Sequence, residues 1–216
     1  MNQLLLDVEF KFHELWDSSF LDVLAPSHVN SANEPASSDS MAVAATQDRR
    51  ARDHQLSQML DRFYALSVQK DRNDAGRALE VLLNDLFRFF DLEPRLPFRV
   101  QGEEIDGSVI LDYQTYLIEA KWTQNPVSER DLLIFRGKVE GKSAFTRGFF
   151  ISINNFTSGA KESIVRGKQP TFFLVDGYDL SLVLRGHVPL PEMLRFKLRK
   201  LTEEGQVFVS AQQLCM

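Results

Sequence analysis

The spacing of hydrophobic residues predicts two amphipathic helices in the middle of the chain. Apolar side chains recur every three or four residues over residues 50–69 and again over residues 74–91, which is the period of one helix face. The polar run Asp71–Asn73 separates the two helices, and Pro94 and Pro97 end the second. We expect both helices to bury their apolar faces against the rest of the molecule.

Strand and helix patterns then alternate to the end of the chain. The expected strands are Phe98–Gln101, Glu104–Leu111, Tyr116–Trp122, Arg147–Ile153 and Thr171–Val175, with Gln206–Ser210 as a last edge strand. The expected helices cover residues 127–140, 156–166, 177–186 and 190–204. This alternation predicts an α/β protein with a central mixed β-sheet flanked by helices.

The first 47 residues differ in composition from the rest of the chain, and the sequence divides into three parts. Residues 1–24 form an acidic segment with a helical apolar pattern, either a helix packed on the main domain or a docking element for a partner chain. Residues 25–47 are rich in Ser, Ala, Asn and Pro and have few large apolar groups, so we expect a flexible linker. Residues 48–216 then form the main domain.

Cysteine content and hydrophobicity indicate the cellular compartment. The single cysteine, Cys215, excludes an intrachain disulfide and suits a reducing compartment. The apolar run at the start is too short for a signal peptide, and no stretch reaches the roughly 18 apolar residues that span a bilayer. We expect a cytoplasmic protein with no membrane partner.

The segment Tyr116–Trp122 carries the most informative chemistry. Side chains alternate faces in a strand, so Glu119 and Lys121 share one face of an otherwise apolar strand. Asp106 precedes Glu119 by 13 residues, and a hairpin turning near residue 113 would bring it opposite about position 120. We therefore expect Asp106, Glu119 and Lys121 to converge.

Two neighbouring carboxylates repel each other unless a cation lies between them, and oxygen ligands of this kind suit Mg²⁺, with Mn²⁺ as the alternative. Glu80, on the preceding helix, could complete the metal shell or hold an outer-shell water. Lys121 would orient or deprotonate a metal-bound water, or balance charge in the transition state. The competing interpretation is purely structural: Asp106 starts a turn, Glu119 and Lys121 form a solvated pair, and Glu80 lies on a helix surface.

These residues resemble the PD-(D/E)XK nuclease superfamily, and their surroundings resemble its Mrr-like, type IV restriction endonuclease branch. The similar pieces are Gly76–Glu80, Ile105–Gly107, YLIEAKW, Phe135–Lys138, RGFFISINNFT and VDGYDLSLVLRG, within residues 55–210. The resemblance implies a restriction-endonuclease-like core, Mg²⁺-dependent hydrolysis of DNA, and a role in defence against foreign DNA. Ile105 replaces the proline of the superfamily name, and Glu119 stands where many Mrr-like members have Gln.

The charge distribution predicts where DNA would bind. Residues 121–168 contain nine basic and four acidic residues, a balance of +5 in a chain of net charge -5, whereas residues 1–53 have a balance of -5. A basic face beside the metal site would bind phosphates. The candidate contacts are Arg136, Lys138, Lys142, Arg147 and Asn154.

Two other functions fit the same residues. One is a nucleic-acid-binding or assembly module that keeps the fold without turnover. The other is a nuclease acting on RNA or on branched junctions. A homodimer, or a partner protein bound through the N-terminal segment, is a further expectation.

Overall fold

The computed structural model describes residues 38–100, 102–167 and 169–215, and it divides the chain into two units, Met1–Thr46 and Gln47–Met216. The segment predicted at residues 1–24 and the linker predicted as far as residue 37 lie outside the described residues. Residues 38–47, which the composition assigns to the linker, belong instead to helix α3, Ser38–Ser67. The reason is that Ala, Met and Gln, which dominate residues 41–47, are good helix formers even without an apolar face.

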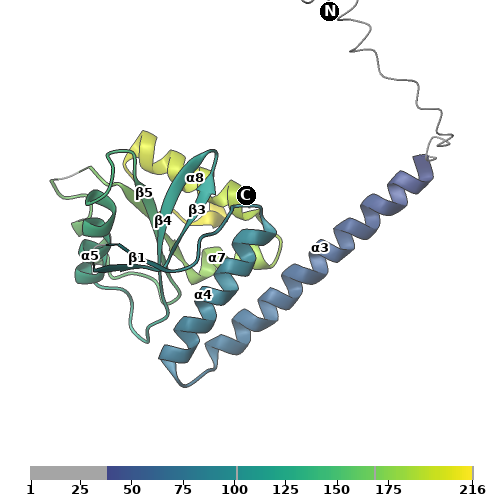
Figure 1. Ribbon diagram of the computed structural model, residues 1–216, viewed down its shortest axis with the longest axis horizontal. Helices are drawn as coiled ribbons and strands as arrows, with labels where there is room; N and C mark the ends of the chain where they lie inside the picture. The colour runs from purple at the N-terminus through teal and green to yellow at the C-terminus, as the bar shows by residue number, and fades with distance from the viewer. Residues whose placement is uncertain (1–37, 101, 168, 216) are drawn as a thin grey trace, which may run out of the picture. The chain divides into compact units, whose positions relative to one another are not determined.

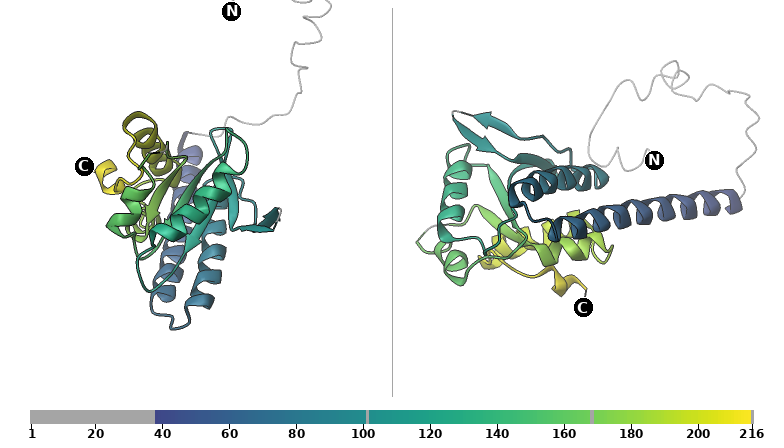
Figure 2. Two further views of the ribbon diagram at one scale, coloured as in Figure 1. Left: turned by 90° about the vertical axis from the view of Figure 1, so that its left-hand side faces the viewer. Right: turned by 90° about the horizontal axis from the view of Figure 1, so that it is seen from below.

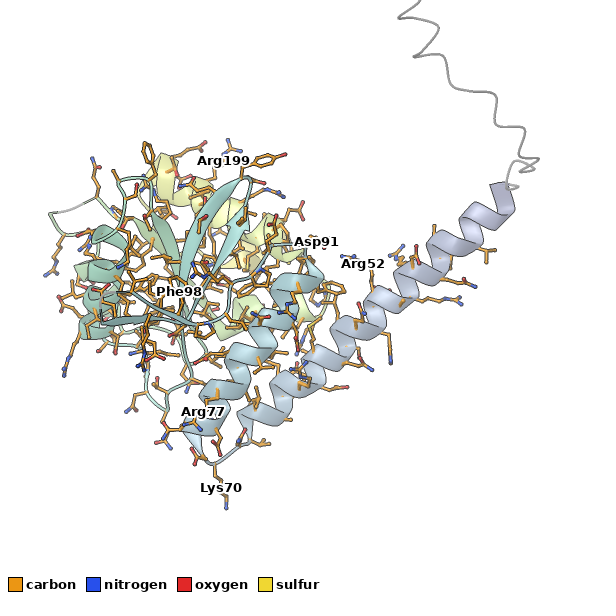
Figure 3. The ribbon with its side chains drawn as sticks, viewed as in Figure 1. Arg52, Lys70, Arg77, Asp91, Phe98 and Arg199 are labelled. Atoms are coloured by element: carbon orange, nitrogen blue, oxygen red, sulfur yellow. The ribbon has the colours of Figure 1, made fainter. Side chains whose placement is uncertain are left out.

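Within the second unit, the later part of α3 packs beside helix α4, Arg72–Phe89 (Figures 1 and 2). Asp71 caps α4 by accepting hydrogen bonds from the backbone N–H groups of residues 73 and 74. Arg62 of α3 pairs with Asp85 of α4 at 2.7 Å. The guanidinium of Arg52, labelled in Figure 3, lies 4.5 Å from the ring centroid of Phe89. Two neighbouring helices are confirmed, and each buries apolar residues, Met59 and Phe63 on α3 and Leu79, Leu82, Leu83 and Leu86 on α4.

A mixed four-stranded sheet forms the centre of the domain, in the order β3-β4-β5-β6. Its strands are β3, Gly107–Leu111; β4, Gln114–Lys121; β5, Arg147–Ser152; and β6, Phe172–Asp176. Strands β3 and β4 are antiparallel, whereas β4, β5 and β6 are parallel. The predicted α/β class with a mixed sheet is confirmed.

Helices cover both faces of this sheet. Phe149 and Phe150 are successive residues of β5, so their side chains point to opposite faces. The ring of Phe149 contacts Phe87 of α4, and the ring of Phe150 contacts Phe135 of α5, Glu129–Glu140. Helices α4 and α5 therefore lie on opposite faces. The remaining helices are α6, Ser158–Ser163; α7, Gly177–Leu184; α8, Leu190–Glu204; and the short 3₁₀ helix η2, Ala211–Leu214.

The predicted strand Glu104–Leu111 is divided in two at Asp106. Its first part is β2, Glu103–Ile105, which pairs with β1, Phe98–Val100, in a separate two-stranded ribbon that stands away from the main sheet (Figure 2). Its second part is β3. Gly107 permits the change, because a Cβ there would lie 2.8 Å from the carbonyl oxygen of Arg95. Asp106 thus marks the point where the chain passes from one sheet to the other.

The edge strand predicted at Gln206–Ser210 does not form. Its backbone makes one hydrogen bond to β6, from the N–H of Leu174 to the carbonyl oxygen of Val207, at 2.9 Å. The ammonium of Lys197 binds the carbonyl oxygens of Leu174 and Val209, which removes acceptors that a strand ladder would need. In the part of the chain that the structure describes, no helix has the length and apolarity needed to cross a bilayer.

Candidate active site

The β3–β4 hairpin brings the two predicted carboxylates together. Gly107 pairs with Ile118 in the antiparallel register, and extending that register by one residue brings Asp106 opposite Glu119. The sequence predicted a partner near position 120, one residue further along. The difference arises at the turn, where Asp112 and Tyr113 both have positive φ (49° and 64°) and close a two-residue hairpin loop. Asp106 directly precedes β3, so this register places it beside Glu119, and the charge of Asp106 acts on the Glu119 carboxyl.

Asp106 is held against the end of β4. Its Oδ2 accepts a hydrogen bond from the backbone N–H of Ala120 at 2.9 Å. Burial raises the pKa of the Asp106 carboxyl above its ordinary value, and the hydrogen bond from Ala120 and the charge of Lys138 only partly oppose this rise. The charged form of Asp106 is therefore poorly solvated at this position.

Glu119 is more enclosed, with 8% of its surface exposed. Its Oε2 lies 2.5 Å from the Nζ of Lys138, which reaches it from α5. Burial raises the pKa of Glu119, and the negative charge of Asp106 raises it further, while the ion pair with Lys138 lowers it without cancelling the rise. Two desolvated carboxylates that repel each other are the electrostatic condition that a bound cation would relieve.

Lys121 also makes its contact with α5. Its Nζ lies 2.5 Å from Oδ1 of Asp131, whose Oδ2 accepts hydrogen bonds from the backbone N–H and the hydroxyl of Ser128. Burial opposes ionisation of Asp131, but the bonds from Lys121 and Ser128 outweigh it and leave the pKa of Asp131 below its ordinary value. The capping box at the start of α5 therefore also fixes the ammonium of Lys121.

Glu80 approaches Asp106 from α4. Both residues line a cavity of about 110 Å³ whose wall also includes Ile118 and Ala120, the β4 residues that alternate with Glu119. Burial raises the pKa of Glu80, and the negative charges of Asp106 and Glu104 raise it further. Asp106 thus has a carboxylate neighbour on each side.

The three carboxylates do not form one ligand set. Among residues 38–215, leaving out the undescribed positions 101 and 168, no group of three or more His, Cys, Asp or Glu side chains is arranged to hold a metal ion. The donor set that fits a hard divalent cation is the pair Asp106 and Glu119, since both offer only oxygen and both are short of compensating charge. A metal on this pair would take further ligands from water or substrate.

Two of the predicted phosphate contacts are turned inward. Lys138 pairs with Glu119, and its side chain is 14% exposed. Arg136 is buried: it donates a hydrogen bond to the carbonyl oxygen of Ile164 at 2.6 Å and pairs with Glu140 at 3.1 Å. The four-residue spacing of Lys138 and Lys142, with Arg136 close by, indicated a basic surface, but Lys138 is turned to β4 and Arg136 to the end of α6. Arg136 links α5 to α6 instead of facing a ligand.

The other three predicted contacts are nearer to solvent but already bonded. Lys142 pairs with Glu103 at 2.7 Å. Arg147 donates hydrogen bonds to the carbonyl oxygens of Ala144 and Thr146. The side-chain amide of Asn154 binds the carbonyl oxygens of residues 123 and 124, so it closes the loop that follows β4.

Sequence reasoning missed a buried ionic network behind the site. Lys197 pairs with Asp179 at 2.6 Å, with side chains 1% and 0% exposed, and Asp179 also accepts hydrogen bonds from the backbone N–H groups of Ala211 and Asp176. A signal was present in the sequence, because Lys197 falls on the apolar stripe of α8 with Met193, Leu194 and Leu201. A lysine at such a position predicts a buried partner.

Three comparisons with known proteins give one family match and one match among solved structures. A family model described as a restriction endonuclease (Mrr_cat) matches residues 73–184, from α4 to the end of α7. Among solved structures, the crystal structure of a protein of unknown function, AF1548, is 20% identical over 60% of this chain and 78% of that chain, with a TM-score of 0.41. A search of curated proteins gave no match.

Proposed function

Because this chain belongs to the restriction endonuclease family whose model spans residues 73–184, we propose that it is a metal-dependent endonuclease that hydrolyses phosphodiester bonds of DNA. The observation that carries the proposal is the placement of Asp106 opposite Glu119, with Lys121 two residues further along the same strand face. Burying charged side chains on a strand face costs free energy unless the charges are paired, hydrogen-bonded or bound to a metal ion.

Asp106 and Glu119 are the residues we assign to the metal, Mg²⁺ or alternatively Mn²⁺. When bound, such an ion polarises a phosphate oxygen and lowers the pKa of a coordinated water. Glu80 contributes from the cavity that it shares with Asp106, where its carboxylate can hold a water in the outer shell. The raised pKa values of all three carboxyls fit this assignment, because each carboxylate gains when positive charge arrives.

The two lysines have separate tasks in this mechanism. Lys138 partly compensates the charge of Glu119 through Oε2, and its ammonium would bind a phosphate oxygen of the substrate if a cation took over that compensation. Lys121 is fixed by Asp131, which keeps the ammonium at the carboxyl end of β4, where it can orient the attacking water or balance charge on the reacting phosphate.

The biological role we propose is restriction of foreign DNA. It rests on the family and on the basic balance of residues 121–168, which carry a net charge of +5. Phosphate contacts of this kind bind DNA without regard to sequence, so sequence or modification preference has to come from other parts of the protein or from a partner.

A cleavage assay tests the proposal. Supercoiled plasmid and single-stranded DNA are each incubated with the purified chain in Mg²⁺, in Mn²⁺ or in EDTA, alongside Asp106→Asn and Lys121→Met. We expect metal-dependent nicking that falls at least 100-fold in both variants, consistent with the size of effects from single acid–base or charge-stabilising groups.

Matched controls are available on the surface of the same domain. Asp85→Asn and Lys200→Met change the same residue types in exposed or partly exposed pairs outside the site, and both should cleave like the wild-type protein. Binding of DNA without cleavage under every condition would instead support a catalytically silent module of the same fold.

A further inference from the structure

A second hollow lies along the same strand face as Glu119. It is a groove of about 640 Å³ between the β1–β2 ribbon, the β3–β4 hairpin and the loop that joins α5 to β5. Phe98, labelled in Figure 3, and Ile105 give it an apolar wall from the ribbon, and Leu117 of β4 forms part of its floor. Ser143 and Thr146 add hydroxyl groups from the loop. The groove therefore combines an apolar wall with a polar side.

Two aromatic side chains project from the edge of the groove. Tyr113 is fully exposed and Phe145 is 82% exposed, although large apolar groups are normally buried. Tyr113 also has φ of 64°, a left-handed conformation that a hairpin turn usually gives to Gly or Asn. Neither packing nor turn geometry explains a tyrosine here, and strained residues concentrate at functional sites.

The backbone segments that carry the two aromatics are hydrogen-bonded to each other. The side-chain amide of Gln114, next to Tyr113, donates a hydrogen bond to the carbonyl oxygen of Phe145 at 2.8 Å. Asp112, on the other side of Tyr113, is held by three hydrogen bonds from Arg195 of α8. The hairpin turn is thus tied to two neighbouring elements, which fixes the backbone positions that carry both aromatics.

The groove leads to the candidate active site along two elements. On β4, Leu117 of the groove and Glu119 of the site are two residues apart and share one strand face. On α5, Lys138 pairs with Glu119, and Lys142, four residues later and at the helix end, lines the groove. The groove and Glu119 therefore share two elements, β4 and α5, and Lys138 lies on Glu119 between them.

We propose that this groove binds unpaired nucleotides of a nucleic-acid strand and directs that strand to the carboxylate pair. The inference rests on the proposed nuclease function and specifies its substrate as single-stranded DNA or a duplex with an unpaired tail. Tyr113 and Phe145 stack on bases, and Lys142, Ser143 and Thr146 contact the backbone. Stacking requires free base faces, which a continuous duplex does not offer.

Binding without metal tests the groove separately from catalysis. Fluorescence anisotropy in EDTA compares a 12-nucleotide single strand with a blunt duplex of the same sequence, for the wild-type chain, Tyr113→Ala and Phe145→Ala. Loss of one stacked base weakens binding by about 5- to 100-fold. We expect that loss for the single strand in both variants, unchanged duplex binding, and tighter binding of the single strand by the wild-type protein.

Exposed apolar residues outside the groove supply the control. Leu133→Ala on α5 and Tyr178→Ala on α7 remove side chains that are 44% and 48% exposed, and both should bind like the wild-type protein. Equal affinity of the two aromatic variants and the wild-type protein for the single strand, or tighter binding of the duplex, would overturn the proposal. So would a groove that takes up an apolar peptide but no oligonucleotide.

The two proposals can fail independently. Single-strand binding that depends on Tyr113 and Phe145, without cleavage in Mg²⁺ or Mn²⁺, would retain the groove and reject the nuclease. Metal-dependent cleavage of a single strand or of a tailed duplex that is unchanged in both aromatic variants would retain the nuclease and reject the groove.

Discussion

At the scale of single residues, the site consists of carboxylates whose charge the fold does not fully compensate. Asp106, Glu119 and Glu80 all have raised pKa values, and burial is the largest cause for each. A carboxyl whose pKa is higher in the folded than in the unfolded state keeps its proton longer when folded. Stability therefore falls as pH rises from about 4, the ordinary carboxyl value, through the folded pKa.

This predicts that Asp106→Asn stabilises the metal-free protein at neutral pH. The amide oxygen of Asn can still accept the hydrogen bond from Ala120, while the charge repulsion between residue 106 and both Glu119 and Glu80 disappears. We expect Tm in EDTA to rise at pH 7, by about 2–4 °C for each kcal/mol recovered, and the gain to shrink at pH 4. Asp85→Asn, in an exposed pair, should show no such rise. A lower Tm for Asp106→Asn at pH 7 would contradict this account.

At the scale of elements, α5 and α8 each hold the sheet through ionic side chains. Helix α5 engages both charges of β4, through Lys138 and Asp131, so its position controls the state of the site. Helix α8 is fixed by Lys197, which contacts Asp179 of α7 and the backbone of β6. Burial lowers the pKa of Lys197, although Asp179 opposes that shift, so the pair is costly to separate.

Breaking the buried pair should therefore destabilise the domain strongly. Asp179→Asn leaves the ammonium of Lys197 without its counter-charge, and removing one partner of a buried pair costs about 3–5 kcal/mol. Arg199→Ala, in an exposed pair with Glu203 on the same helix, should cost about 0–1 kcal/mol. Urea unfolding followed by circular dichroism gives both values, and equal costs for the two variants would refute a special role for the buried pair.

At the scale of the whole molecule, the charges are divided along the chain. Residues 1–37 contain six acidic residues and one basic residue, a balance of -5 that equals the net charge of the entire protein. The rest of the chain is therefore neutral overall, and residues 121–168 are basic. We infer that the acidic segment weakens the attraction between this protein and DNA.

Deletion of residues 1–37 should then tighten DNA binding at low salt. The effect should shrink above about 0.1 M salt, where the screening length is about 10 Å. Anisotropy titrations at 20 mM and 200 mM NaCl measure it. A full-length variant with the six acidic residues changed to amides separates the effect of charge from steric blocking. Its affinity for DNA should match that of the deletion variant. Identical affinities for all three proteins would remove the hypothesis.

The sequence by itself determined the class of fold and part of the charged residues that the candidate site brings together. Apolar residues that recur every 3.6 or every 2 positions predicted α4, α5, α8 and the strands to within a few residues. The reason is that an element with one buried face has apolar residues at regular intervals. Alternation in β4 likewise predicted that Glu119 and Lys121 share a face. The helical boundary at Ser38 and the absence of an edge strand after Gln206 were not predicted, because side-chain competition and helix propensity decided them.

Only the tertiary structure decided which charges meet. The one-residue register that brings Asp106 opposite Glu119 depends on the strained turn at Asp112 and Tyr113, and the pairing of Lys138 with Glu119 depends on how α5 docks on β4. Spacing along a helix gives the face of a lysine but not what that face covers, so residues predicted to face DNA turned inward. Contacts between elements distant in sequence carry no local signal, and for that reason the groove beside Leu117 was visible only in the folded chain.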